Sequence, residues 1–182
     1  DQSKLPATRR TNLVGPQIPQ WNLPTTPPYL IAGRSGPACI LDQHGDAYIF
    51  GGRADGATTD IVLTVEKYSP PYQTTSPNTI SEPAITAPSP GPLTLAQFPF
   101  VFLLPTGNFF VAGPGQNTWI LTRSTTWSWS AGATNSNHAQ SEGATCVMTE
   151  PGVFVKIGGL DISDDPPSAV ATISRIDMNV AS

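Results

Sequence analysis

Three segments of the chain share one pattern of apolar and polar positions. Each has an apolar run rich in β-branched and aromatic residues, a tight turn with glycine, and a second apolar run that ends at glycine; the segments are 36–52, 98–114 and 142–159. Such runs favour strands over helices, and the glycine supplies the positive φ that a tight hairpin needs. The pattern therefore predicts three β-hairpins in an all-β chain with almost no helix.

Recurrence of the pattern predicts the architecture. The glycines that end the hairpins are Gly51, Gly52, Gly113, Gly158 and Gly159, with Ala112-Gly113 in place of the pair in the second segment. A unit repeated at such spacing buries its apolar faces only against its neighbours, which is typical of propellers and solenoids. We interpret the chain as a β-propeller segment of about three blades. An antiparallel sandwich also has glycine hairpins, but it does not require the same order of elements to recur.

Residues beyond each hairpin extend the pattern. Tyr68 follows the first hairpin, Trp127 the second, and Ile176-Asp177 the third. The arrangement resembles the kelch-type propellers of the galactose oxidase and glyoxal oxidase group, in which a third strand carries a Tyr-Asp-type pair and a fourth carries Trp. The resemblance covers roughly residues 18–180 and implies four-stranded blades.

The repeat divides the chain into six parts. They are an extended arm at 1–17, the fourth strand of a preceding blade with a linker at 18–35, a first blade at 36–80, a Pro-rich insertion at 81–97, a second blade at 98–135, and a third blade without its fourth strand at 136–182. Seven prolines within residues 69–97 predict an extended surface segment that cannot form a central strand. We expect the fourth strand of the first blade to dissolve into this segment. It is either a plain loop between blades or a site of O-glycosylation.

The two ends of the predicted propeller are complementary. Trp21 lies on a fourth strand whose blade is otherwise missing, whereas the last blade stops after its third strand, at Ile176 and Asp177. Propellers usually need four to eight blades. Three solutions stay open: the chain is a piece of a longer protein, several copies form one propeller, or Trp21 of one copy adds a strand beside Ile176 and Asp177 of the next. The expected partner is protein.

Candidate catalytic residues are sparse. The resembled oxidases are copper-radical enzymes with a cysteine-crosslinked tyrosine, a second tyrosine and two histidines. The crosslinking-cysteine position is Gly36 here, with Cys39 three residues further on, and the counterparts of the axial tyrosine are Phe98 and Gly143. No tyrosine precedes a histidine, and the histidines are His44 and His138 alone. We therefore expect no catalytic residue, no metal site and no cofactor, although a fragment of such an oxidase remains an alternative.

The cysteines and the acidic loop also favour structural roles. Cys39 and Cys146 occupy equivalent inner strands of the first and third blades, which the central channel separates, so we expect two buried free thiols. Asp161, Asp164 and Asp165 gather on one loop. They lack the ordered spacing of a calcium loop, and we interpret them as solvated charges.

Aspartates also flank the turns of the first repeat. Asp42, Asp46, Asp55 and Asp60 could pair with Arg34 or Arg53 in a structural role.

Tryptophans suggest a further alternative. Trp119, Trp127 and Trp129 could stack on sugar rings, since flat aromatic faces suit pyranoses, or could pack between blades. A carbohydrate-binding propeller is therefore a third possibility.

Charge and hydropathy exclude other classes. The net charge is -4 with 12% charged residues, which argues against a nucleic-acid partner, and no apolar run is long enough to span a membrane. The sequence predicts a non-catalytic, extracellular structural or interaction protein.

Overall fold

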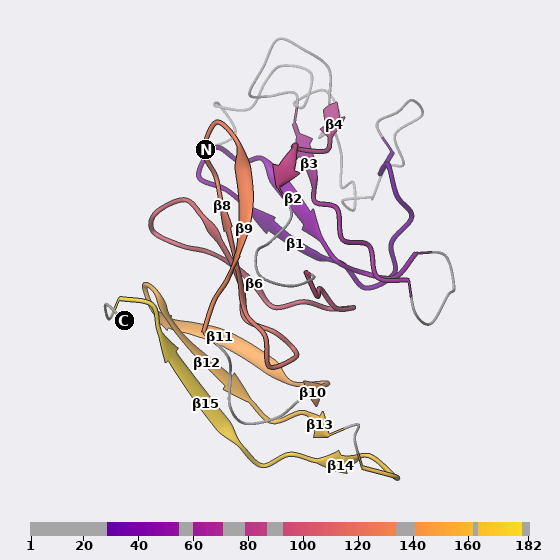
Figure 1. The fold of residues 1–182 in the computed structure, drawn as a ribbon, viewed down its shortest axis with the longest axis vertical. Helices are drawn as coiled ribbons and strands as arrows, with labels where there is room; N and C mark the ends of the chain where they lie inside the picture. Colours follow the sequence, from indigo (N-terminus) through magenta and orange to yellow (C-terminus); the bar gives the residue numbers. More distant parts are fainter. Residues whose placement is uncertain are drawn as a thin grey trace, which may run out of the picture.

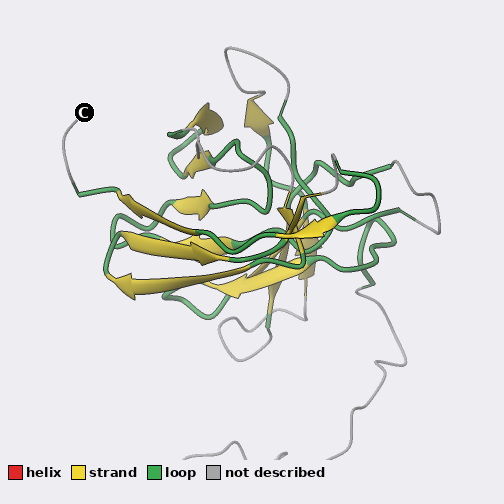
Figure 2. Cartoon of the chain, turned by 90° about the horizontal axis from the view of Figure 1, so that it is seen from below, coloured by secondary structure: helices red, strands yellow, loops and turns green. Residues whose placement is uncertain are grey.

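The computed structural model describes residues 29–54, 60–70, 79–86, 93–133, 141–161 and 164–179. In these ranges the regular structure consists of β-strands, which confirms the all-β prediction (Figure 2). The described ranges contain no helix long and apolar enough to cross a membrane. The predicted arm at 1–17, the predicted strand at Trp21, and His138 lie outside the described residues.

The first sheet follows the predicted first repeat. Its strands are antiparallel and lie in chain order: β1 (Ala38–Leu41), β2 (Ala47–Phe50), β3 (Glu66–Ser69) and β4 (Thr79–Ser81). The sequence predicted that the fourth strand would dissolve into the Pro-rich run. That expectation was wrong for residues 79–81, because these three residues contain no proline and each can donate its N–H to a ladder.

The second sheet has one strand more than a four-stranded blade. It contains β6 (Val101–Leu103), β7 (Phe109–Val111), β8 (Trp119–Thr122) and β9 (Trp127–Ala131), and β5 (Ile85–Thr86) pairs in parallel with β9 at its edge. The two residues of β5 come from the predicted Pro-rich insertion. Their place at the sheet edge agrees with the expectation that this segment does not form a central strand.

The third sheet has three strands. They are β11 (Thr145–Glu150), β12 (Val153–Ile157) and β15 (Ile173–Asp177), and the order is β11-β12-β15. A separate, fourth sheet contains β10 (Ser141–Glu142), β13 (Leu160–Asp161) and β14 (Ser168–Ala169), with β13 in the middle. Within the described ranges, no strand pairs with the outer edge of β15.

The first three sheets follow one another along the molecule (Figure 1). Two separate cores with aromatic side chains lie between them. In the first core the ring of Phe109 lies 4.9 Å from that of Tyr48 and 5.2 Å from that of Phe50. In the second, the ring of Phe154 lies 4.8 Å from those of both Phe102 and Phe110. Because side chains alternate along a strand, the second sheet presents one face to each neighbour. This succession is a propeller-like all-β fold.

Equivalent positions in the repeats are set by the glycine in each hairpin turn. Gly45, Gly107 and Gly152 have φ values of 81°, 83° and 78°. Six residues after each of them comes a glycine with positive φ: Gly51 (60°), Gly113 (144°) and Gly158 (63°). Gly113 is therefore the counterpart of Gly51, and Pro114 that of Gly52, so the expected pairing of Ala112-Gly113 with the glycine pair was shifted by one residue.

Close packing explains why glycine is needed at the end of β2. A Cβ on Gly51 would lie 2.4 Å from the carbonyl oxygen of Ala96, and the N–H of Gly52 donates to that same oxygen at 3.1 Å. The glycine pair thus lets the end of the first sheet touch the segment that leads into the second.

Candidate functional site

Two of the three positions that the resemblance matches to the copper site, Gly36 and Phe98, meet in space, whereas a Cβ on the third, Gly143, would have no neighbour within 4 Å. Gly36 precedes β1 and Phe98 precedes β6, and the N–H of Phe98 donates to the Gly36 carbonyl at 2.6 Å. A Cβ on Gly36 would lie 2.7 Å from the Phe98 ring, which is itself 63% exposed. The two side chains are a hydrogen atom and a phenyl ring, and neither offers a ligand atom to a metal.

Histidine and cysteine lie apart from this position. His44 is exposed in the β1–β2 turn, where its ring contacts the Gln43 amide at 3.3 Å. Cys39 and Cys146 are both free. Cys39 is exposed, which corrects the expectation that it is buried: as the first strand of its sheet, β1 leaves one face of Cys39 open. In the described part of the chain, no three His, Cys, Asp or Glu side chains gather.

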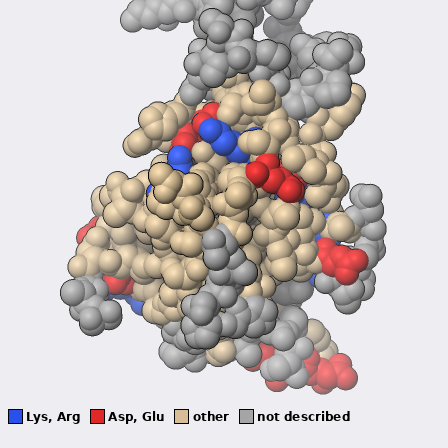
Figure 3. Space-filling model, turned by 45° about the horizontal axis from the view of Figure 1, so that its top comes forward, with Lys and Arg blue, Asp and Glu red and all other residues tan. Residues whose placement is uncertain are grey.

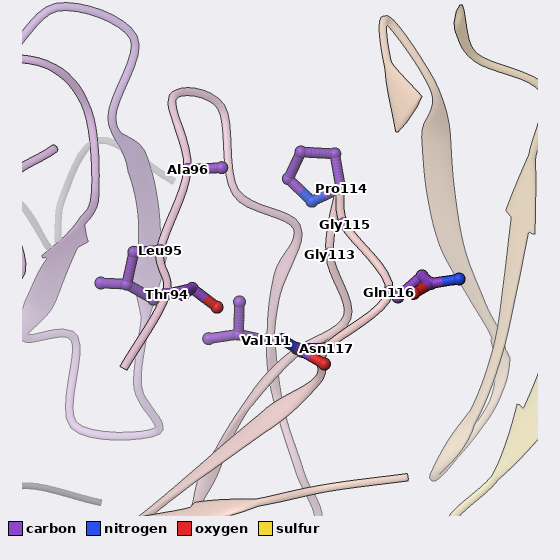
Figure 4. A pocket seen from close by; sticks show the side chains of 9 residues that line it. All are labelled: Thr94, Leu95, Ala96, Val111, Gly113, Pro114, Gly115, Gln116 and Asn117. Atoms are coloured by element: carbon purple, nitrogen blue, oxygen red, sulfur yellow. The ribbon is translucent and has the colours of Figure 1, made fainter. Parts of the chain in front are cut away.

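A cavity of about 360 Å³ opens where the chain enters the second sheet (Figure 4). Its walls are residues 94–96, residues 113–117 and Val111 of β7. The polar groups are the Thr94 hydroxyl and the side-chain amides of Gln116 and Asn117. None of the lining side chains is acidic, basic or a thiol, so the cavity can form hydrogen bonds with a small polar molecule but supplies no general acid or base.

Lys156 braces the loop beside this cavity. The side chain is buried, and its ammonium donates to the carbonyl oxygens of Pro114 at 2.8 Å and Gly115 at 3.4 Å. Burial lowers the pKa of Lys156 and raises the pKa of its cross-strand neighbour Cys146 to about 11. Cys146 is therefore a neutral thiol at physiological pH, and the Lys156 contact holds the second and third sheets together.

The tryptophans lie in the first core. Trp119 and Trp129 are 4% and 5% exposed, so their faces are not open for sugar stacking. Trp127 is half-buried and lies beside Tyr48 and Phe109, with the Arg123 guanidinium 5.3 Å from its ring centre. These placements agree with the packing role and correct the glycan-stacking interpretation of Trp119 and Trp129, because strand alternation turns both rings toward the first sheet.

An ion pair between Arg123 and Asp42 joins the first two sheets. The Arg123 guanidinium donates to the Asp42 carboxylate at 2.9 Å and lies 5.0 Å from the Tyr48 ring centre. Lys67 pairs with Asp46 at 2.6 Å. The sequence had suggested Arg34 or Arg53 as partners of these aspartates. Arg34 instead pairs with Glu66. On the face shown in Figure 3, charged side chains lie in small groups among neutral residues, some of mixed sign and some acidic alone.

The Asp42 contacts predict a pH dependence of stability. Burial raises the pKa of Asp42, but hydrogen bonds from the His44 N–H, from Arg123 and from the Asp46 N–H outweigh burial and hold the pKa below its ordinary value of 3.8. A carboxyl with a depressed folded-state pKa stabilises above its unfolded-state pKa, and that contribution is lost as pH falls through the folded-state value. We expect the free energy of unfolding to drop below about pH 4. Urea titrations at several pH values should show a shallower drop for Asp42→Asn; an unchanged pH profile would contradict this assignment.

The outer edge of β15 carries backbone groups with which no strand of the described ranges pairs. The Met178 N–H donates to the Gly152 carbonyl, and the Gly158 N–H donates to the Thr172 carbonyl. Even-numbered residues of β15 therefore face β12. In an antiparallel ladder the alternate residues point the other way, so the N–H and C=O groups of Ile173, Arg175 and Asp177 point to the outer edge. Asp177 was a predicted strand-exchange residue; Ile176, the other one, turns its backbone toward β12 and its side chain into the second core.

The acidic loop remains on the surface. Asp164 and Asp165 are exposed, and the Asp164 carboxylate accepts a hydrogen bond from the Ser168 hydroxyl. Asp161 lies in β13. The placement of Asp164 and Asp165 is that of solvated loop charges, in line with the sequence interpretation, whereas half-buried Asp161 belongs to a strand.

Comparison with known proteins supports the architecture. No family model and no curated protein matches the chain. Among solved structures, a fungal alcohol oxidase of the AA5 family, determined in complex with copper, is similar with a TM-score of 0.51 and 16% sequence identity. The alignment covers 82% of this chain and 34% of the oxidase, so the chain spans about a third of that protein. At this identity the likeness concerns the fold: the chain has the propeller-like all-β architecture of part of a copper oxidase.

Proposed function

We propose that the chain is a non-catalytic structural and interaction element of an extracellular protein, built on part of a kelch-like propeller. It binds other polypeptide by accepting a strand at the outer edge of β15, and further copies of itself are the partner that can be tested directly. The observation that carries the proposal is the row of outward backbone groups on Ile173, Arg175 and Asp177. Such an edge is a template for strand addition.

Two alternatives have weaker support. A fragment of a copper-radical oxidase is favoured by the structural likeness to the fungal enzyme. The contact between Gly36 and Phe98 supports the non-catalytic proposal instead, because it fills the corresponding position with groups that do not bind copper. A carbohydrate-binding propeller retains only the half-buried Trp127 of its three tryptophans. Stoichiometric copper on this chain, together with aldehyde oxidation, would overturn the non-catalytic proposal.

An edge variant tests the strand-addition proposal. Arg175→Pro removes one outward N–H and leaves the bonds between β15 and β12 in place, since proline is tolerated on edge strands. In sedimentation velocity we expect the parent chain to associate as its concentration rises, and the variant to remain at the lower mass. Arg175→Ala, which removes the charge but keeps the N–H, is the matched control and should associate like the parent.

Two results would count against strand addition. One is association of Arg175→Pro to the same extent as the parent chain. The other is a parent chain that stays a monomer at every concentration. Circular dichroism of both variants before sedimentation verifies that the sheets are intact.

A further inference from the structure

The third sheet has one apolar face that the described residues leave uncovered except at Val153, which is buried. We call it the front face and define it by Val147, Val155, Ile157, Ile173 and Arg175, which the strand register places on one side. Val147 is 44% exposed, Ile157 is 42% exposed and Ile173 is 69% exposed. Exposed apolar side chains clustered on one sheet face are typical of an interaction surface.

The repeat shows what such a face does elsewhere in the molecule. Counted from the turn glycines, Val155 corresponds to Tyr48 of the first sheet and Phe110 of the second. Tyr48 and Phe110 are 1% and 0% exposed. In both cases the next sheet covers the face, so the front face of the third sheet continues a series of two established sheet-to-sheet contacts.

One aromatic residue anchors each of these contacts. It is the second residue after the turn glycine of the covering sheet: Phe109 on Tyr48 and Phe50, and Phe154 on Phe102 and Phe110. Both anchor rings are buried, at 0% and 1% exposure. Aromatic rings in these tilted and edge-on arrangements stabilise a contact beyond the area that they bury.

A second copy of this chain lacks that anchor on the sheet that would have to cover the face. In its first sheet, the position equivalent to Phe109 and Phe154 is Ala47. The space next to Ala47 on the same sheet is filled by this chain itself. There the buried Glu66 carboxylate accepts hydrogen bonds from the Arg34 guanidinium and from the N–H groups of residues 31 and 32. If copies stacked head to tail through this face, the first sheet of the second copy would therefore provide no aromatic ring to pack against Val147 and Val155.

We infer that the front face of the third sheet docks a further propeller sheet, supplied by polypeptide outside these 182 residues, with an aromatic residue as the second residue after its turn glycine. The ring seats on Val147 and Val155. These valines stand where the second sheet has Phe102 and Phe110, so they leave room for a ring of the size of Phe or larger. The alignment with the fungal oxidase covers only 34% of that protein, so the rest of its chain is long enough to contain further sheets. The inference rests on the propeller-like fold and is independent of strand addition at β15.

A lengthened chain tests the inference. A second copy of residues 134–179 is joined after Ser182. It supplies a further third sheet, which carries the Phe154 anchor on the face opposite its own front face. We expect the midpoint of thermal unfolding to rise by about 5 °C, because covering the front face buries Val147, Val155 and Ile157. The control has Phe154→Ala in the added copy alone and should not show the rise. In the lengthened chain Ile157→Lys should lower the midpoint, whereas in the 182-residue chain it should change little because that side chain is exposed.

Three results would overturn the inference. The added sheet leaves the midpoint unchanged, or the control shows the same rise, or Ile157→Lys abolishes self-association of the 182-residue chain, which would make a second copy the occupant of the face. The thermal measurement is intramolecular. Failure of docking at the front face can therefore be distinguished from failure of strand addition at β15. The first is measured by thermal unfolding, and the second by sedimentation of Arg175→Pro.

Discussion

Arg34→Met is expected to lower the free energy of unfolding by about 3–5 kcal/mol, because it leaves a buried carboxylate without its cation. The side chains of Arg34 and Glu66 are both 0% exposed and lie 2.8 Å apart. Arg34 also donates to the carbonyl oxygens of Gly51 at 2.9 Å and Thr64 at 3.0 Å. Urea unfolding followed by tryptophan fluorescence measures the loss as a shift of the midpoint at unchanged slope.

A double variant separates the buried charge from the lost packing. Arg34→Met with Glu66→Leu removes both charges, and we expect it to be more stable than Arg34→Met alone, since no unpaired carboxylate remains. A loss within about 0.5 kcal/mol for Arg34→Met would be the behaviour of a surface residue and would contradict burial of this ion pair.

Phe109→Ala is expected to cost about 3–5 kcal/mol, the usual range for a large aromatic residue truncated in a core. The ring is fully buried and contacts Tyr48 and Phe50 across the two sheets. The Arg123 guanidinium also lies 5.2 Å from its centre. We expect the variant to unfold at a markedly lower denaturant concentration.

Phe98→Ala is the matched control for the core variant. It removes the same side chain from a position that is 63% exposed, so its cost should remain below about 1 kcal/mol. Equal losses for the two phenylalanine variants would mean that the first core is not organised around Phe109.

Hairpins and their glycines could be predicted from the sequence because they depend on local chemistry. A positive φ at Gly45 or Gly51 is a requirement of the backbone at that residue, and it leaves a signature that needs no knowledge of the rest of the chain. The alternation in Tyr48-Ile49-Phe50 likewise predicts a strand before any partner is known. The resemblance to kelch-type blades predicted Trp127 on the fourth strand of the second blade, and Trp127 begins β9.

Pairings across the fold could not be predicted in the same way. From the sequence, Arg34 or Arg53 was the predicted partner of the aspartates in the first repeat. In the structure Asp42 instead pairs with Arg123, which is 81 residues away in sequence. The sequence also allowed Trp119 and Trp129 to stack on sugar rings, whereas both side chains are buried against the first sheet. Such outcomes depend on which face of one sheet meets which face of the next, and hydrophobicity alone does not distinguish a ring that faces a neighbour from one that faces solvent.

The sequence by itself determined that this protein is a row of repeated β-hairpins with glycine at fixed positions, because turn geometry and strand alternation are local. It also determined that the candidate copper positions hold Gly36 and Phe98. Only the tertiary structure decided that those two residues touch and that Glu66 holds Arg34 in the interior. It also decided that the described residues leave the face around Ile157 and the edge at Arg175 open. Contacts between residues far apart in sequence exist only once the sheets have packed, and that packing decides which surfaces are left for a partner.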